Sequence, residues 1–151
     1  MNIPSNIMIH HSAVMHAKNP DQFLANNSYH KNKWNFKSSL GFFLGYNYEI
    51  SALGRIRQAR VEGETTAACY QKSMNDGRCI HICLDGNFEI EKPTDDQVDS
   101  LRFLLMGLMC NFSIVRENIF FHKQFANTAC PGKNLKLDFI RSLGGLARST
   151  S

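Results

Sequence analysis

Short hydrophobic runs bounded by turn residues predict the strands of this chain. Asn6 to His11 form one such run, which ends in two adjacent histidines, and Cys79 to Leu84 form another, which an Asp-Gly pair closes. Runs of this length between turn signals are typical of buried strands. A third, brief run from Ile119 to Phe121 leads directly into His122 and a polar loop.

Two further strands joined by a turn are expected between residues 40 and 60. Leu40 to Ser51 is rich in aromatic and aliphatic residues, a turn follows at Leu53 and Gly54, and Arg55 to Arg60 continues on the other side. A turn flanked by such segments is a common signature of paired strands.

Capping signals and apolar spacing predict three helices. The sequence Asn-Pro-Asp at residues 19–21 is a helix-start signal, so the first helix is expected from about Pro20 to Lys31. The second begins after Thr94, which forms a capping box with Gln97. Its apolar residues lie on one stripe that packs on the core: Val98, Leu101, Leu105, Leu108, Met109 and Phe112. A last helix is expected from about Asn134 to Leu143.

Strands that alternate with helices predict an α/β fold with a central sheet covered by helices on both faces. The 151 residues, 43% of them hydrophobic, match one ordinary domain with a substantial core. We expect this domain to cover residues 1–143. Two glycines end the last helix, and the tail at residues 144–151 is expected to be disordered.

The chain contains no candidate for export or membrane insertion. No stretch of about 20 apolar residues exists, which excludes a membrane-spanning helix. The first residues also lack the basic region and the long apolar core of a signal peptide. We therefore expect synthesis in the cytoplasm without a signal peptide.

Positive charge is concentrated in residues 31–60, although the formal net charge is only +4. This segment carries six basic residues against Glu49, whereas residues 61–99 carry nine acidic residues against three basic ones. A basic face suits nucleic acid or an anionic cell wall, but on charge alone a solvated surface is the simpler interpretation. We find no known nucleic-acid reader motif, so no nucleic-acid partner is expected.

Histidines and cysteines offer several candidate metal sites. Cys79, His81 and Cys83 alternate along one expected strand and share a face, but their side chains stand about 6.6 Å apart, which is wide for one ion. Buried thiols beside a histidine are the simpler interpretation. Two histidine pairs lack the spacing of the helical zinc motif HExxH and are expected to be hydrogen-bonded or exposed: His11 with His16, and His16 with His30.

A third candidate joins His10, His122 and Cys130. Two imidazoles and a thiolate suit zinc, and three protein ligands leave a fourth position open for water. The spacing alone is weak support, because more than a hundred residues separate the first ligand from the others. The other four cysteines of the odd, scattered set of five are expected to be free thiols, as in a reducing compartment.

Five segments occur in the order expected of the type-2 N-acetylmuramoyl-L-alanine amidase family, and the chain resembles this family from about Ile7 to Leu135. They are IMIHHSA, SSLGFFLGYNYEI, GRIRQAR, SMNDGRCIHICLDGNF and FHKQFANTACPG. The family includes amidase-type phage lysozymes and peptidoglycan recognition proteins. The resemblance implies their fold, a mixed central sheet with helices on both faces, and makes residues 1–143 the catalytic domain.

The resemblance also implies the site residues. The zinc ligands of the family fall on His10, His122 and Cys130, which implies one Zn²⁺ per chain. The tyrosine of the family's Gly-Tyr strand falls on Tyr46, and the residue two before the third ligand is Thr128. These two would serve catalysis, Tyr46 by orienting water or passing its proton and Thr128 by stabilising an oxyanion.

The implied activity is hydrolysis of the amide bond between N-acetylmuramic acid and L-alanine in bacterial peptidoglycan or muropeptides. His30 and Trp34 match a pattern that precedes the Gly-Tyr strand in relatives, and Asn75 matches a further position. These three would line the substrate groove. For His30 and Trp34, packing at the end of a helix is the structural alternative.

Some positions depart from the family pattern. Cys83 stands where some branches place a glutamate base, and Glu49 is no obvious substitute because strand alternation points it away from Tyr46. His81 replaces the usual glycine. A histidine that many members carry before Asn75 is missing.

We therefore expect an endolysin-like, bacteriolytic enzyme that acts on the cell wall after release, or an amidase of cytoplasmic muropeptides. The basic segment at residues 31–60 would supply affinity for the wall. The alternative is a non-catalytic peptidoglycan-binding protein on the same fold. Binders of this kind typically lose the cysteine ligand, so Cys130 favours catalysis.

Overall fold

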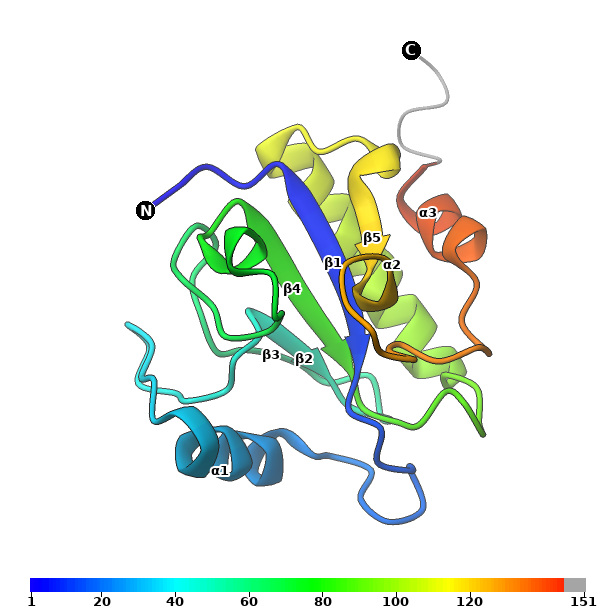
Figure 1. Ribbon diagram of the computed structural model, residues 1–151. Coiled ribbons are helices and arrows are strands. Elements are labelled where there is room, and N and C mark those ends of the chain that lie inside the picture. The colour runs from blue at the N-terminus through cyan, green and yellow to red at the C-terminus, as the bar shows by residue number, and fades with distance from the viewer. Residues whose placement is uncertain (146–151) are drawn as a thin grey trace.

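The expected strands assemble into one mixed sheet of five, in the order β3-β2-β4-β1-β5. The structure, a computed structural model, describes residues 1–145 (Figure 1). β1 pairs in parallel with β4 and with β5, β2 pairs in parallel with β4, and only β2 and β3 are antiparallel. The elements in chain order are β1 (Asn6–His11), α1 (Phe23–Trp34), β2 (Tyr48–Ile50), β3 (Ile56–Gln58), η1 (Lys72–Asn75), β4 (Cys79–Leu84), α2 (Asp95–Phe112), η2 (Arg116–Asn118), β5 (Ile119–Phe121), η3 (His122–Gln124) and α3 (Leu137–Gly145).

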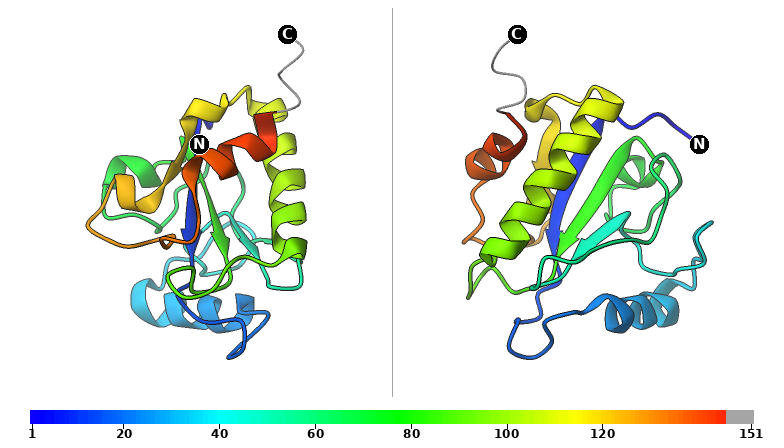
Figure 2. Two further views of the ribbon diagram at one scale, coloured as in Figure 1. Left: turned by 90° about the vertical axis from the view of Figure 1, so that its right-hand side faces the viewer. Right: turned by 180° about the vertical axis from the view of Figure 1, so that it is seen from behind.

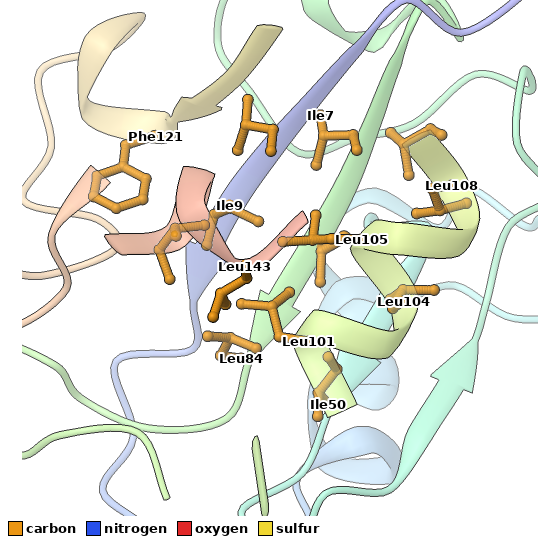
Figure 3. Close-up of a cluster of buried hydrophobic side chains, with 14 of the residues drawn as sticks. Ile7, Ile9, Ile50, Leu84, Leu101, Leu104, Leu105, Leu108, Phe121 and Leu143 are labelled. Carbon is orange, nitrogen blue, oxygen red and sulfur yellow. The ribbon is translucent and has the colours of Figure 1, made fainter. Parts of the chain in front are cut away.

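Helices cover both faces of the sheet, which confirms the predicted fold class. α2 and α3 pack against one face, and α1 lies on the other side, near the ends of β1 and β4 (Figure 2). The main core lies between the sheet and α2 with α3, as Figure 3 shows, and includes Ile7, Ile9, Leu101, Leu105 and Leu143. No helix in residues 1–145 is long and apolar enough to cross a membrane.

The capping box predicted before α2 is present and also anchors the helix to the sheet. Gln97 N–H donates to Thr94 Oγ1, and Thr94 N–H donates to Gln97 Oε1. The buried amide of Gln97 further donates to the carbonyls of Ile50 and Asp85, where β2 and β4 end. The start of α2 is therefore fixed to the carboxyl ends of β2 and β4.

The strand expected over Leu40 to Ser51 is wrong for most of its length, because only Tyr48–Ile50 is a strand. The backbone N–H groups of Phe43 and Leu44 donate to Asn27 Oδ1 on α1 instead of to a neighbouring strand. Side chains, rather than a neighbouring strand, thus accept the hydrogen bonds of these backbone N–H groups. A hydrophobic run in the sequence does not distinguish these two cases.

Arg60 explains why this irregular segment is stable. Its side chain is fully buried, and the guanidinium donates to the carbonyls of Phe36, Leu44 and Thr65. Arg60 therefore cannot contribute to a basic surface, and Arg57 is paired with Asp21 at 3.1 Å. The expected basic face is smaller than the sequence indicates.

Other helix and strand boundaries shift by a few residues. α1 begins at Phe23, three residues later than expected, because Asp21 N–H bonds to Asn19 Oδ1 and Gln22 N–H bonds to Asp85 Oδ2. The second strand of the pair, β3, is shorter than expected, and α3 begins at Leu137. Gly144 and Gly145, which were expected to follow the last helix, belong to α3. The rest of the expected tail, residues 146–151, lies outside the described residues.

Leu105→Ala should cost about 2–5 kcal/mol of unfolding free energy, because Leu105 is fully buried beneath α2 and truncation leaves a cavity. Phe103→Ala on the same helix is the control, since Phe103 is 76% exposed and should change stability by about 0.5 kcal/mol or less. Urea denaturation of both variants measures the difference. Equal losses would contradict the assigned core face of α2.

Candidate metal centre

Two parallel strands and one loop bring His10, His122 and Cys130 together. Ile9 on β1 lies opposite Phe121 on β5. The residues that follow them, His10 within β1 and His122 just after β5, therefore lie side by side near the carboxyl ends of these strands, with ring centroids 4.6 Å apart. The loop after β5, orange in Figure 1, then returns to the carboxyl end of β1. Lys123 N–H donates to the Cys130 carbonyl at 2.9 Å and closes that loop. The seven residues between His122 and Cys130 therefore form a closed loop.

The geometry of the three side chains fits a single metal ion. One ligand atom from each residue can be chosen so that all three lie within 4.8 Å of one another, and His10 Nδ1 lies 3.9 Å from Cys130 Sγ. Zinc bonds of about 2.0–2.3 Å at tetrahedral angles would place ligand atoms roughly 3.3–3.6 Å apart, so a small contraction completes the site. His122 Nε2 is buried without a hydrogen-bond partner, as expected of an atom reserved for a ligand. No other such group occurs in residues 1–145.

Burial sets the protonation of these ligands in the absence of an ion. It raises the pKa of the Cys130 thiol to about 12, although the His11 backbone N–H, which donates to Sγ at 3.3 Å, acts in the opposite direction. Burial also lowers the pKa of His10 and of His122. Without metal, the centre therefore holds a neutral thiol and two neutral imidazoles near neutral pH.

The outer nitrogen of His10 is held by a second buried histidine. His10 Nε2 lies 2.8 Å from His81 Nδ1, and His81 Nε2 lies 2.6 Å from the Met74 carbonyl oxygen. Strand alternation does place Cys79, His81 and Cys83 on one face, but they form no metal group. From the sequence, His81 is a member of the alternating group with Cys79 and Cys83 and a departure from the family pattern, and no contact with His10 is predicted. The adjacency of β1 and β4, which no local pattern reveals, creates its contact with His10.

Tyr46 lies beside the candidate metal ligand His10. Its ring centroid is 4.8 Å from that of His10 and 5.5 Å from that of His30. Burial, and then the neighbouring Cys83, Cys130 and Glu49, raise the pKa of the hydroxyl well above its usual value. The phenol thus keeps its proton near neutral pH and can donate a hydrogen bond.

The expectation that Glu49 points away from Tyr46 is wrong. Both side chains lie toward α1, where Glu49 accepts a hydrogen bond from Asn26 at 3.1 Å. Strand alternation does not extend to Tyr46, because β2 begins only at Tyr48. Burial and the nearby Asp85 raise the pKa of Glu49. Its Oε1 is therefore held by Asn26, whereas its Oε2 is buried without a hydrogen-bond partner.

Thr128 is exposed at the rim of the centre, two residues before Cys130. Its hydroxyl oxygen accepts the backbone N–H of Cys130 at 3.2 Å. This bond fixes the hydroxyl next to a candidate metal ligand and leaves its proton free to be donated to another molecule.

A cleft of about 520 Å³ leads from His122 to the outer end of α1. His30, Trp34 and Asn75 all line it, together with Tyr46. Its two sides meet where Ala67 N–H donates to the Gly45 carbonyl, so closely that a side chain at residue 45 would collide with the Ala67 oxygen. A larger hollow of about 740 Å³ near the N-terminus contains none of the three candidate metal ligands.

The residues that line the cleft differ in how many of their polar atoms already form hydrogen bonds within the protein. His30 Nδ1 accepts the Gly45 N–H at 2.8 Å, and its ring packs on Trp34 with centroids 4.6 Å apart. The Asn75 side chain accepts hydrogen bonds from Thr66, Ala68 and Cys69 and donates to the Cys69 carbonyl. Asn75 therefore shapes the cleft by holding the loop at residues 66–69. His11 and His16 are also hydrogen-bonded within the chain.

Comparison with known proteins agrees with this geometry. The chain is similar in structure to the N-acetylmuramoyl-L-alanine amidase LysC from Clostridium intestinale, with 26% identity, a TM-score of 0.75, and coverage of 93% of this chain and 84% of that one. The endolysin of the Thermus scotoductus bacteriophage Ph2119 has 19% identity and a TM-score of 0.73, with 95% and 86% covered.

Peptidoglycan recognition proteins share the fold as well. The complex of recognition proteins LCa and LCx with tracheal cytotoxin gives a match of 22% identity and a TM-score of 0.73, with 92% of this chain and 81% of that one covered. A search of curated proteins gave no match. The model of the N-acetylmuramoyl-L-alanine amidase family, however, matches residues 1–133. The chain therefore belongs to the N-acetylmuramoyl-L-alanine amidase family.

Proposed function

We propose that this protein is a zinc-dependent amidase that cleaves the bond between N-acetylmuramic acid and L-alanine in peptidoglycan. One observation carries the proposal: His10, His122 and Cys130 converge at one end of a cleft, with His122 Nε2 buried and unpartnered. This donor set leaves room for a fourth ligand, as catalytic zinc sites require. Zinc held there would supply Lewis acidity and activate a water molecule for attack on the amide carbonyl.

The side chains around the ligands suit the remaining steps of amide hydrolysis. The neutral phenol of Tyr46 can donate a hydrogen bond that orients the water or the carbonyl group. Thr128 can donate its hydroxyl proton to the developing oxyanion, because its own oxygen is already fixed by the Cys130 N–H. Water adds to the carbonyl carbon, the carbon–nitrogen bond breaks, and the amine leaves with a proton as the new N-terminus of the peptide.

The cleft supplies the binding surface for the glycan and the peptide. Aromatic side chains line it at Tyr29 and Trp34, and Lys33 and Lys72 add positive charge suited to the carboxylates of a peptide. An endolysin-like role on the cell wall agrees with the similarity to amidase endolysins. Action on cytoplasmic muropeptides would use the same groove.

A non-catalytic peptidoglycan-binding protein is the second candidate, and the similarity to recognition proteins LCa and LCx favours it. Cys130 weighs against it. The cysteine is buried, receives a hydrogen bond on its sulfur and faces His10, which is the environment of a metal ligand. The two functions differ in whether the bound substrate is cleaved.

Digestion of purified peptidoglycan separates them. We expect the protein to release new alanine amino termini without new reducing sugar ends, and Cys130→Ser to lose most of its zinc and activity. Cys110→Ser is the matched control, because that thiol is exposed on α2, and it should behave as the wild type. Binding of peptidoglycan without release of amines would support the non-catalytic alternative, and reducing ends without amines would indicate a glycosidase.

Tyr46→Phe should lower kcat about a hundredfold with unchanged zinc content, because it removes a proton donor and keeps the ring that packs on His10. Tyr70→Phe makes the same chemical change at a side chain that is 95% exposed and should leave kcat near the wild-type value. Steady-state kinetics and metal analysis measure both variants. An unchanged kcat in Tyr46→Phe would remove its hydroxyl from the mechanism.

Zinc affinity should rise about tenfold per pH unit between pH 6 and 8. Binding displaces the proton of Cys130, whose pKa is raised to about 12, whereas His10 and His122 have lowered pKa values and are already neutral. Lower pH therefore weakens binding. Calorimetry in buffers of different ionisation enthalpy should count about one proton released per zinc, and a count of zero would mean that the thiol is not a ligand.

A further inference from the structure

His81 lies behind the candidate metal ligand His10, away from the cleft. Both side chains are fully buried, and they come from neighbouring parallel strands, β4 and β1. His81 Nδ1 is 2.8 Å from His10 Nε2, and His81 Nε2 is 2.6 Å from the carbonyl oxygen of Met74. The two rings thus form a chain of two hydrogen bonds that ends on a backbone carbonyl.

The end of this chain determines where each proton lies. A carbonyl oxygen only accepts hydrogen bonds, so His81 Nε2 must carry a proton and donate it to Met74. A neutral imidazole has one N–H, which leaves His81 Nδ1 as an acceptor. The proton between the rings therefore belongs to His10 Nε2, and His10 Nδ1 keeps a free lone pair.

A charged His81 would be poorly stabilised in this position. Its side chain contacts the His10 ring and the Met74 carbonyl, and its backbone N–H donates to the Asn47 side chain, so none of its hydrogen-bond partners is acidic. A buried cation without a counter-charge is costly. The neutral arrangement is the one that the surroundings support.

We propose that His81 is a positioning residue that holds His10 in the single tautomer able to bind the metal through Nδ1. This inference rests on the proposed metal centre, toward which His10 Nδ1 points, 3.9 Å from Cys130 Sγ. Outer hydrogen bonds of this kind fix both the tautomer and the ring orientation of metal-binding histidines. Here the acceptor is a second histidine, in place of the glycine of the family pattern.

The same two hydrogen bonds link His10 to one side of the cleft. Met74 belongs to η1, and its neighbour Asn75 holds the loop at residues 66–69 by four hydrogen bonds. His81 is therefore the connection between the orientation of His10 and the position of that loop. Loss of His81 should make both the ring orientation of His10 and the position of the loop at residues 66–69 more variable.

The tautomer can be measured directly in the metal-free wild-type protein. Nitrogen NMR of ¹⁵N-histidine-labelled protein distinguishes protonated from unprotonated ring nitrogens. We expect a proton on His10 Nε2 and none on Nδ1, and for His81 likewise a proton on Nε2 alone. A proton on His10 Nδ1, or rapid exchange between the two tautomers, would overturn the proposal.

Substitution of His81 by two residues of nearly equal shape tests its effect on metal binding. Asparagine keeps an acceptor near the position of Nδ1, whereas leucine removes it. We expect His81→Leu to weaken Zn²⁺ binding about 10- to 100-fold and to alter the Co²⁺ absorption spectrum, and His81→Asn to restore most of the affinity. Wild-type affinity in His81→Leu, or equal losses in both variants, would overturn the proposal.

Two controls separate this inference from the proposed function. Circular dichroism verifies that each variant is folded, and if His81→Leu does not fold, the NMR measurement on the wild type decides. A wild-type protein that binds no Zn²⁺ would overturn the metal centre itself. The tautomer of His10 in the metal-free protein would still show whether His81 fixes it.

Discussion

The position of β1 between β4 and β5 is the constraint on which the core and the candidate site both depend. Side chains alternate along a strand, so Ile7 and Ile9 enter the core beneath α2 while Met8 and His10 face the other side. A shift of one residue in the pairing would exchange these two sets. The hydrophobic effect that fixes the register of β1 therefore also places His10 at the site.

Much of the fold was predictable from local patterns. β1, β4 and β5 have their expected bounds, and the capping box before α2 is present, because each rests on a continuous apolar run or on a short-range cap. The family resemblance added what spacing could not, the combination of His10 with two ligands more than a hundred residues away. The structure brings those three together. Their roles as ligands, and those of Tyr46 and Thr128 in catalysis, stay predictions.

The parts that sequence reasoning missed depend on long-range contacts. The segment before β2 looked like a strand because it is hydrophobic, but Arg60 and the side chains of α1 satisfy its backbone. The alternation expected to separate Glu49 from Tyr46 does not apply, because β2 begins only at Tyr48, and Tyr46 lies in the irregular segment before it. The contact of His81 with His10 exists only because β4 and β1 are neighbours in the sheet, which the sequence around His81 does not reveal. In each case the deciding partner is distant in sequence.

The irregular side of the cleft has a consequence for local unfolding. The backbone N–H groups of Phe43 and Leu44 donate to Asn27, and that of Gly45 donates to His30, so both acceptors are side chains of α1. Amides in β1 and β4 are protected by the sheet and exchange with solvent only when the sheet opens. Those of the cleft segment are released as soon as α1 moves away. Their hydrogen-exchange rates therefore report how often this side of the groove opens while the core stays folded.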